Sequence, residues 1–455
     1  MLNLLVANRG EIAVRVIRSA RELGIRTVAV CSETDANALH VRLADEHVVI
    51  GPAPASRSYL DIDAVLSAAE RTGADAVHPG YGFLSERADF AQRVVDAGLT
   101  FVGPSPQAIR LMGDKALARS TAAQAGVPTV PGSDGAVTCA ADAESVADRI
   151  GFPLVIKAAG GGGGRGIHVV RSVDELTAAL PQARAEAGVA FGTDEVYLER
   201  FVTRARHVEV QVFGDGEQFI HLGERDCSLQ RRRQKILEEA GAPALPAAIR
   251  DAMTAAAVRL AAQVRYRGAG TVEFLFDADR GEFAFIEMNT RIQVEHPVTE
   301  MVTGVDLVRE QLTVADGAPL SLTQDQVQPR GHAIELRINA EDPLRHFQPS
   351  PGPLRQLRLP SGPFVRTDSG CEAGGAVSPF YDSLIAKVVV WADTREAAIG
   401  RAKRAMDEVE VQGVQTTAAF LRQVLEMPAF LEASHHTTAL EAWMADQGDE
   451  ARRSA

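Results

Sequence analysis

Alternation of apolar and polar residues predicts a series of strands along the second half of the chain. Segment 206–213 places valine at every second position, and segments 271–276 and 282–286 alternate in the same way. The pattern returns at 331–340 and 383–390. A period of two is typical of strands with one buried face, so these segments predict a sheet that packs one face on a core.

Near the N-terminus, the pattern switches between strand and helix. Apolar runs at 3–7 and 27–31 flank a stripe of apolar residues with helical spacing at 12–20. A strand, a helix and a second strand at this spacing predict a βαβ unit on a parallel sheet. The connecting turn lacks the G-x-G-x-x-G of dinucleotide-binding folds, which disfavours a nicotinamide cofactor.

Glycine and proline divide the middle of the chain. The turn-dense segment 126–132 is a candidate boundary, and glycines at 160–164 separate predicted strands at 152–157 and 167–170. A glycine loop between strands can bring backbone N–H groups onto phosphate oxygens, and its flexibility suits a closing lid. Single helices are expected at 301–312 and 395–409, and polar residues from Gln447 onward are expected to fray.

Composition restricts the class of protein. The chain has 455 residues, of which 46% are hydrophobic and 24% charged, which is typical of a globular protein of two to four domains. A net charge of −13 argues against nucleic acid or an anionic membrane as the main partner. The four cysteines are far apart, and neither a signal peptide nor a membrane span is visible, so a cytoplasmic protein is expected.

Candidate chemistry is concentrated between residues 287 and 295. Glu287 and Asn289 leave a predicted strand on the same face and are hard ligands suited to Mg²⁺ holding nucleotide phosphates, with Glu273 on the neighbouring strand as a further carboxylate. The next positions on that face, if the chain stays extended, are Arg291, Gln293 and Glu295. A fork-shaped cation, an amide and a base predict an anion site beside a metal-bound triphosphate, and hence phosphoryl transfer onto a small carboxylate-like acceptor.

Several other polar features each allow two interpretations. The glycine-containing loop 78–86 is either a structural loop or part of a site, and His207 either contacts a ligand or is solvated. The basic run 224–235 either covers a solvated face or meets a triphosphate or a small anion. Taken alone, Arg337 has the pattern of a surface or salt-bridge residue.

Four blocks of sequence carry a resemblance to a known family. Segments 6–13, 78–86, 160–166 and 285–297 stand in the order and spacing found in biotin carboxylases, which the chain resembles over nearly its whole length. These are the ATP-grasp subunits of acetyl-CoA, propionyl-CoA and related acyl-CoA carboxylases. The resemblance implies an α/β fold: a Rossmann-like parallel-sheet domain at 1–113, an ATP-grasp domain at 114–326 with a mobile glycine-rich lid at about 131–203, a C-terminal α+β domain at 327–445 and a flexible tail at 446–455.

The resemblance also assigns roles to residues. The implied magnesium (or manganese) ligands are Glu273, Glu287 and Asn289. Bicarbonate is implied to contact Lys235, Arg291, Gln293 and Val294, with Glu295 as the base. The biotin pocket is implied to include Tyr81, Gly82, Arg337 and Asp382, with Arg337 stabilising the biotin enolate. Besides Glu273 and Glu287, the implied ATP-binding residues are Lys115, Lys157, Gly163, Gly164, Glu199, Arg200, Phe201, Val202, His207, Gln230 and Arg233.

The implied activity is ATP-dependent carboxylation of biotin by bicarbonate through carboxyphosphate. No Ala-Met-Lys-Met motif is present, so biotin is expected on a separate carrier protein or domain, with a carboxyltransferase subunit and a homodimer as further partners. Arg233 replaces a histidine frequent in the family, which puts the role of Arg233 in doubt. Gly241 is a second departure, where the usual motif moves straight to proline, and neither change removes a residue of the implied chemistry. The alternatives are another ATP-grasp carboxylate–amine ligase and a silent nucleotide-binding regulatory subunit. The sequence does not indicate the final carboxyl acceptor.

Overall fold

The computed structural model describes residues 1–455 except 134, 159–166, 192 and 454–455. The N-terminal region is a parallel sheet of order β3-β2-β1-β4-β5, with helices on both faces. The predicted βαβ unit is confirmed as β1 (Asn3–Val6), α1 (Gly10–Glu22) and β2 (Arg26–Ser32), with β1 and β2 parallel. The other elements are β3 (Glu46–Gly51), β4 (Ala76–His78), β5 (Thr100–Phe101), α2 (Leu39–Leu43), α3 (Ile62–Thr72), α4 (Ala88–Asp96) and α5 (Pro106–Gly113).

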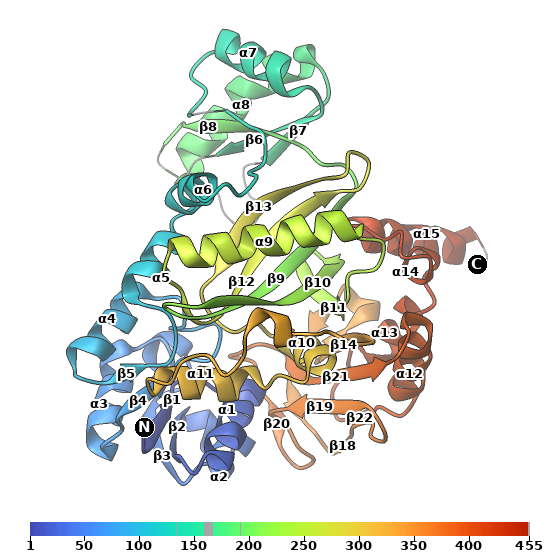
Figure 1. The fold of residues 1–455 in the computed structure, drawn as a ribbon. Coiled ribbons are helices and arrows are strands. Elements are labelled where there is room, and N and C mark those ends of the chain that lie inside the picture. Colours follow the sequence, from blue (N-terminus) through green and yellow to red (C-terminus); the bar gives the residue numbers. More distant parts are fainter. Residues whose placement is uncertain (134, 159–166, 192, 454–455) are drawn as a thin grey trace.

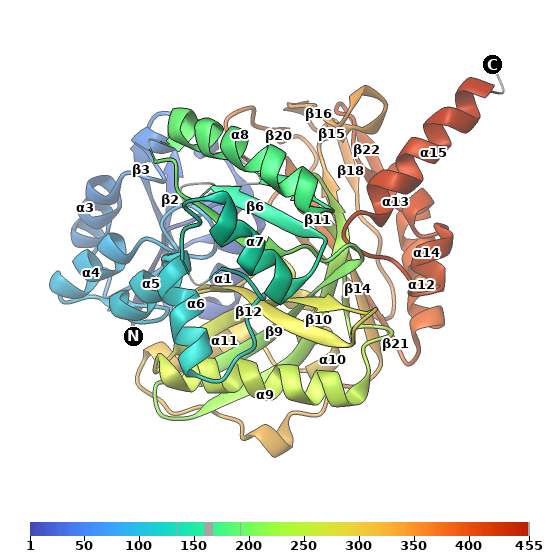
Figure 2. The same ribbon diagram turned by 90° about the horizontal axis from the view of Figure 1, so that it is seen from above.

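A small lobe stands above the rest of the molecule (Figure 1). Its antiparallel sheet, which we call the lid sheet, has the order β7-β6-β8 and consists of β6 (Leu154–Ala158), β7 (Ile167–Val170) and β8 (Val196–Arg200). Helices α7 (Ala140–Ile150) and α8 (Val173–Phe191) cover it, as the view from above shows (Figure 2). Helix α6 (Lys115–Gln124) connects this lobe to the N-terminal region.

The centre of the molecule is an eight-stranded antiparallel sheet of order β13-β12-β9-β10-β11-β14-β21-β19. The predicted alternating segments form β9 (Ala205–Asp215), β12 (Arg267–Asp277), β13 (Glu282–Asn289), β14 (His332–Asn339) and β21 (Leu384–Ala392). The remaining strands of the sheet are β10 (Phe219–Arg231), β11 (Gln234–Ala240) and β19 (Val365–Ser369). Because β11 pairs with β14, the sheet runs without a break into the C-terminal region.

Helices pack on this sheet from several sides. Helix α9 (Ala247–Gln263) contributes to a core with the valines of β9, as the alternation requires. The helix expected at 301–312 is wrong as a single element: Gly304 has a left-handed backbone and separates α10 (His296–Thr303) from α11 (Leu307–Ala315). The C-terminal helices are α12 (Arg395–Asp407), α13 (Ala418–Val424), α14 (Pro428–Leu431) and α15 (Ala439–Arg453).

Two expectations about the C-terminal part have different outcomes. Helix α12 confirms the helix predicted there, ending two residues earlier. The polar residues from Gln447 were expected to fray, but α15 continues to Arg453. Within the described residues, no helix combines the length and the apolar character needed to cross a membrane.

Candidate active site

One cavity of about 1740 Å³ lies between the N-terminal region, the lid sheet and the large sheet. Every described residue that the sequence analysis assigned to a site lines it. These residues are Tyr81, Gly82, Lys115, Lys157, Glu199, Arg200, Phe201, Val202, His207, Gln230, Arg233, Lys235, Glu273, Glu287, Asn289, Arg291, Gln293, Val294, Glu295, Arg337 and Asp382. Gly163 and Gly164 lie outside the described residues.

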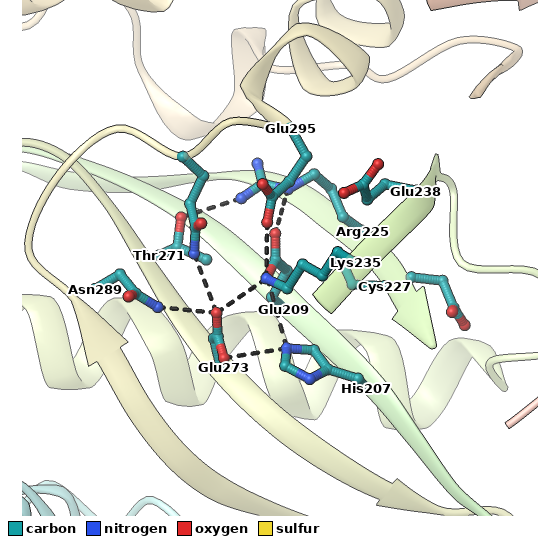
Figure 3. Close-up of polar contacts among 12 residues, drawn as sticks. His207, Glu209, Arg225, Cys227, Lys235, Glu238, Thr271, Glu273, Asn289 and Glu295 are labelled. Carbon is teal, nitrogen blue, oxygen red and sulfur yellow. Dashed lines mark hydrogen bonds and ion pairs between the residues drawn. The ribbon is translucent and has the colours of Figure 1, made fainter. Parts of the chain in front are cut away.

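The floor of the cavity is built around one ammonium group. Lys235, on β11, places Nζ 2.6 Å from Glu209 Oε2, 3.0 Å from Glu273 Oε1 and 2.7 Å from Glu295 Oε1 (Figure 3). Burial opposes the charge on Lys235, but the neighbouring carboxylates outweigh it and raise its pKa well above the usual value. The lysine therefore stays protonated, and its ion pairs connect its own strand β11 to β9, to β12 and to the start of α10.

A second cation, which was not predicted from the sequence, contacts Glu209 from another side. Arg225 is fully buried, and its Nε donates to Glu209 Oε1 at 2.6 Å. Its other nitrogens donate to Gln211, Thr271 and Thr299. The available signal was the polar face of β9, because His207, Glu209 and Gln211 alternate with its valines. Glu209 is thus fixed between Arg225 and Lys235.

The proposed metal ligands are adjacent in the structure. Glu273 and Glu287 face each other across β12 and β13, and Asn289 Nδ2 donates to Glu273 Oε1 at 2.8 Å. Burial raises the pKa of Glu287, and the nearby Glu273 adds to the shift. Hard oxygen donors side by side on neighbouring strands fit a divalent cation such as Mg²⁺.

His207 belongs to this cluster and is not a solvated histidine. Its Nε2 lies 3.1 Å from Glu273 Oε2, and its Nδ1 contacts the Gln230 amide at 3.2 Å. Burial alone would lower the pKa of His207, but the negative charge of Glu273 outweighs burial and raises the pKa to about 9. The contact with Glu273 therefore favours the protonated, positively charged form of His207.

The chain does not stay extended beyond Asn289, so that part of the prediction was wrong. Strand β13 ends there, residues 290–295 turn, and Glu295 becomes the N-cap residue of α10. Arg291, Gln293 and Glu295 nevertheless line the cavity. Arg291 Nε donates to Glu86 Oε2 at 2.8 Å, so the loop 78–86 takes part in the site.

Glu295 stands between two cations, Lys235 and Arg337. Arg337 Nη2 donates to Glu295 Oε2 at 2.8 Å and also forms an ion pair with the buried Glu238. Burial favours protonation of Glu295, but Lys235 and Arg337 outweigh it and hold its pKa below the usual value. An ionised carboxylate in this position can accept a proton from a bound anion. Arg337 lines the cavity and is therefore not the surface residue that its sequence pattern suggested.

The basic run 224–235 is divided by the structure among three environments. Arg225 is buried and Lys235 lies on the floor, whereas Arg233 is exposed at the edge of the cavity. Arg232 and Arg233 form the tip of the β10–β11 hairpin with positive φ angles of 46° and 69°. Neither interpretation of segment 224–235, as a solvated face or as an anion-binding run, therefore holds for the whole segment.

On the lid sheet, Lys157 forms an ion pair with Glu199, which also accepts from Arg119 Nη1 at 2.8 Å. Arg119 was not predicted; it also donates to the Val130 carbonyl and lines the cavity. The side chains of Lys157 and Arg119 are 41% and 37% exposed. This cluster thus borders solvent, unlike the floor.

Comparison with known proteins assigns the chain to a family. Family models match it in three parts: biotin carboxylase, N-terminal domain, at 1–109; carbamoyl-phosphate synthase L chain, ATP binding domain, at 114–323; and biotin carboxylase C-terminal domain at 335–442. The chain is 53% identical to a biotin carboxylase of Nostoc sp. over 96% of its own length and 98% of the relative's. The chain belongs to the biotin carboxylase family. Biotin carboxylase 1 of Bacillus subtilis is 52% identical over 97% of this chain and 98% of the relative.

Solved structures of the biotin carboxylase family share the fold. The biotin carboxylase domain dimer of Hydrogenobacter thermophilus 2-oxoglutarate carboxylase, in complex with MgADP, ADP and bicarbonate, is similar with a TM-score of 0.88 and 45% identity, over 97% of both chains. A biotin carboxylase–β,γ-ATP complex from Campylobacter jejuni has a TM-score of 0.89 and 45% identity, over 97% of this chain and 98% of that one. The predicted fold class and family are confirmed.

Proposed function

We propose that this protein catalyses the ATP-dependent carboxylation of biotin by bicarbonate. The observation that carries the proposal is the contact of Glu295 with both Lys235 and Arg337, in the cavity that the candidate metal ligands also line. A base held ionised between two cations is suited to an anionic substrate that must lose a proton. Membership of the biotin carboxylase family supports the same reaction.

In this proposal, Glu295 removes the proton of bicarbonate, which is held by Lys235, Arg291, Gln293 and Val294. The bicarbonate oxygen attacks the γ-phosphorus of ATP, the bond to ADP breaks, and carboxyphosphate forms. Its breakdown gives carbon dioxide and phosphate, and phosphate takes the ureido proton of biotin. The biotin nitrogen then attacks carbon dioxide, while Arg337 stabilises the enolate and Tyr81, Gly82 and Asp382 border the biotin.

The ATP-binding roles expected from the sequence remain part of the proposal. Magnesium held by Glu273, Glu287 and Asn289 supplies neutralisation of phosphate charge. In the proposal, Lys115, Lys157 and His207 contact phosphate oxygens, whereas Glu199 and the following residues Arg200, Phe201 and Val202 border the nucleotide base. Gln230 supports His207, and Arg233 faces the nucleotide from the hairpin tip. The lid, with Gly163 and Gly164, closes over ATP, and the domain limits of 1–113, 114–326 and 327–445 are retained.

We also propose the partners implied by the family. Biotin arrives on a carrier protein or domain, and a carboxyltransferase subunit consumes the carboxybiotin in the cytoplasm. A homodimer is proposed because the Hydrogenobacter thermophilus relative is described as a dimer.

The test is the transfer of radiolabelled bicarbonate to free biotin by purified protein with Mg²⁺ and ATP. We expect labelled carboxybiotin whose formation requires ATP and is lost in Arg337→Met. Hydrolysis of ATP that depends on bicarbonate but never labels biotin would indicate another acceptor. Absence of both, with ATP still bound, would support a regulatory subunit instead.

A further inference from the structure

Lys387 is a buried lysine that lies outside the cavity described above. It belongs to β21, where its direct neighbours across the sheet are Arg337 on β14 and Asp368 on β19. Its side chain has no exposed surface. Burial of an ammonium group is strongly unfavourable unless charged and hydrogen-bonding partners compensate for the lost water. The partners of Lys387 therefore identify what this lysine holds.

One partner is the turn that carries the proposed base. Lys387 Nζ donates to the Val294 carbonyl oxygen at 2.7 Å. Val294 precedes Glu295 directly, in the segment that leaves β13 and starts α10. The lysine thus fixes the backbone at Val294 from the large sheet, one residue before Glu295.

The second partner connects the turn to the opposite wall of the cavity. Lys387 Nζ lies 3.3 Å from Glu11 Oε1, in the first turn of α1, and the same Glu11 oxygen accepts a hydrogen bond from the Tyr81 hydroxyl. Asp368 is more distant, at 4.0 Å. A continuous polar path therefore runs from Tyr81 through Glu11 and Lys387 to Val294, joining the N-terminal region, the C-terminal region and the central turn.

We propose that Lys387 is a positioning residue that holds the turn at Val294 and Glu295 in the geometry required for bicarbonate. The inference rests on the proposed function, because it assigns bicarbonate to this turn. Lys387 itself does not touch the substrate. The expected signature is a selective loss of bicarbonate affinity, since, among the residues that the structure describes, neither Lys387 nor Glu11 forms a hydrogen bond or ion pair with the lid sheet or with a candidate ATP residue.

The test uses Lys387→Met together with the double variant Glu11→Gln/Lys387→Met. The double variant replaces the buried ion pair with neutral groups of similar shape, which avoids an uncompensated carboxylate and preserves folding where the single variant fails. We expect the KM for bicarbonate to rise about tenfold to a hundredfold in both, because loss of a residue that orients a ligand-binding group has effects of this size. The KM for ATP should change by less than about twofold.

Two controls separate positioning from stability. Lys403 lies on the outer helix α12 and pairs with Glu426. Its replacement in Lys403→Met should leave the KM for bicarbonate unchanged. Glu11→Gln keeps Lys387 and its bond to Val294, so its KM for bicarbonate should rise less than about threefold. An equal effect of Glu11→Gln and the double variant would overturn the proposal, as would a folded double variant with the bicarbonate KM of the unmodified protein.

Bicarbonate binding without nucleotide gives a second readout. Saturation-transfer NMR with labelled bicarbonate should show weaker binding to the double variant than to the unmodified protein. If the unmodified protein binds bicarbonate but carboxylates no biotin, the proposed function fails while the positioning role is still tested by this comparison. Equal bicarbonate affinity in the two proteins would refute the positioning role whatever the reaction.

Discussion

The floor of the cavity and the lid sheet hold their charged side chains in opposite environments. On the floor, Lys235 is 13% exposed and Glu209 is fully buried, whereas Lys157 on the lid sheet is 41% exposed. The floor strands belong to one continuous sheet, but the lid has its own hydrophobic core, built from residues between 137 and 198. Buried charges interact strongly and must be matched to one another, whereas exposed pairs are screened and contribute little.

This difference indicates that the floor and the lid sheet have different roles. The floor network fixes the proposed base and its cations before any substrate binds, which lowers the cost of reorganisation during the proposed reaction. The lid carries the residues proposed to contact the nucleotide, and their present partners can be exchanged for phosphate at small cost. Substitutions on the floor should therefore affect stability and turnover, and substitutions on the lid should affect ATP affinity.

The largest expected effect is on stability, for Arg225→Met. This change leaves the buried Glu209 carboxylate without one of its cationic partners and should destabilise the protein by about 3–5 kcal/mol. The shift in the urea unfolding midpoint measures it. Arg404→Met, which removes an exposed pair with Glu408, is the matched control and should shift the midpoint little. Equal shifts in the two variants would contradict the contrast between buried and exposed charge.

The next largest effect is on turnover, for Lys235→Met. Three carboxylates then lose their shared cation, and kcat should fall about 10²–10³-fold, as for loss of a preorganised electrostatic group. Steady-state ADP release in the presence of bicarbonate and biotin provides the measurement. A decrease of less than about fivefold would show that the floor is not preorganised around this lysine.

A smaller effect concerns the pH dependence of stability. Burial, assisted by Glu295, raises the pKa of Glu238 to about 7 from 4.5 in spite of Arg337. The folded protein therefore binds more protons at this group than the unfolded chain, so this contribution to stability is complete below pH 4.5 and is lost as the pH rises through 7. Relative to Glu238→Gln, the unmodified protein should lose on the order of 2–3 kcal/mol between about pH 5 and pH 8.

Thermal unfolding of both proteins across that pH range tests this expectation. A difference in stability that is constant with pH would show that Glu238 does not titrate there. If the unmodified protein instead became more stable relative to Glu238→Gln as the pH rises, the pKa of Glu238 would be lowered by folding, not raised.

The smallest effect is expected on the lid, for Lys157→Met. The KM for ATP should rise about tenfold, since one charged contact to phosphate contributes roughly 1.4 kcal/mol, while the unfolding midpoint should move little because the pair with Glu199 borders solvent. Arg119→Met removes the other partner of Glu199 and should change the KM for ATP less than about threefold. Loss of stability comparable to that of Arg225→Met would remove the distinction between lid and floor.

The sequence predicted which residues line the cavity better than it predicted their geometry. Alternation located β9, β12, β13, β14 and β21, and the residue types at 287–295 indicated metal and anion binding. The extended course beyond Asn289 was wrong, because the turn at 290–295 is held by distant groups such as Glu86 and Lys387. Local patterns contain no information about such long-range partners.

The buried charges were missed for a related reason. Arg225 and Glu209 have the appearance of ordinary polar residues on a strand, since charged side chains are usually exposed. Their burial becomes intelligible only when β9, β10, β11 and β12 are placed side by side, so that each charge meets its opposite. The polar face of β9 was the one local indication.

The most direct test of the account is ADP release from Mg²⁺-ATP with and without bicarbonate and free biotin, measured for the unmodified protein and Glu295→Gln. The account predicts release that requires bicarbonate, is stimulated by biotin and falls at least about a hundredfold in Glu295→Gln, which keeps the shape of the side chain but cannot accept the proton. Release that is indifferent to biotin, or that persists in Glu295→Gln, would contradict the assignment of Glu295 as the base at a preorganised floor.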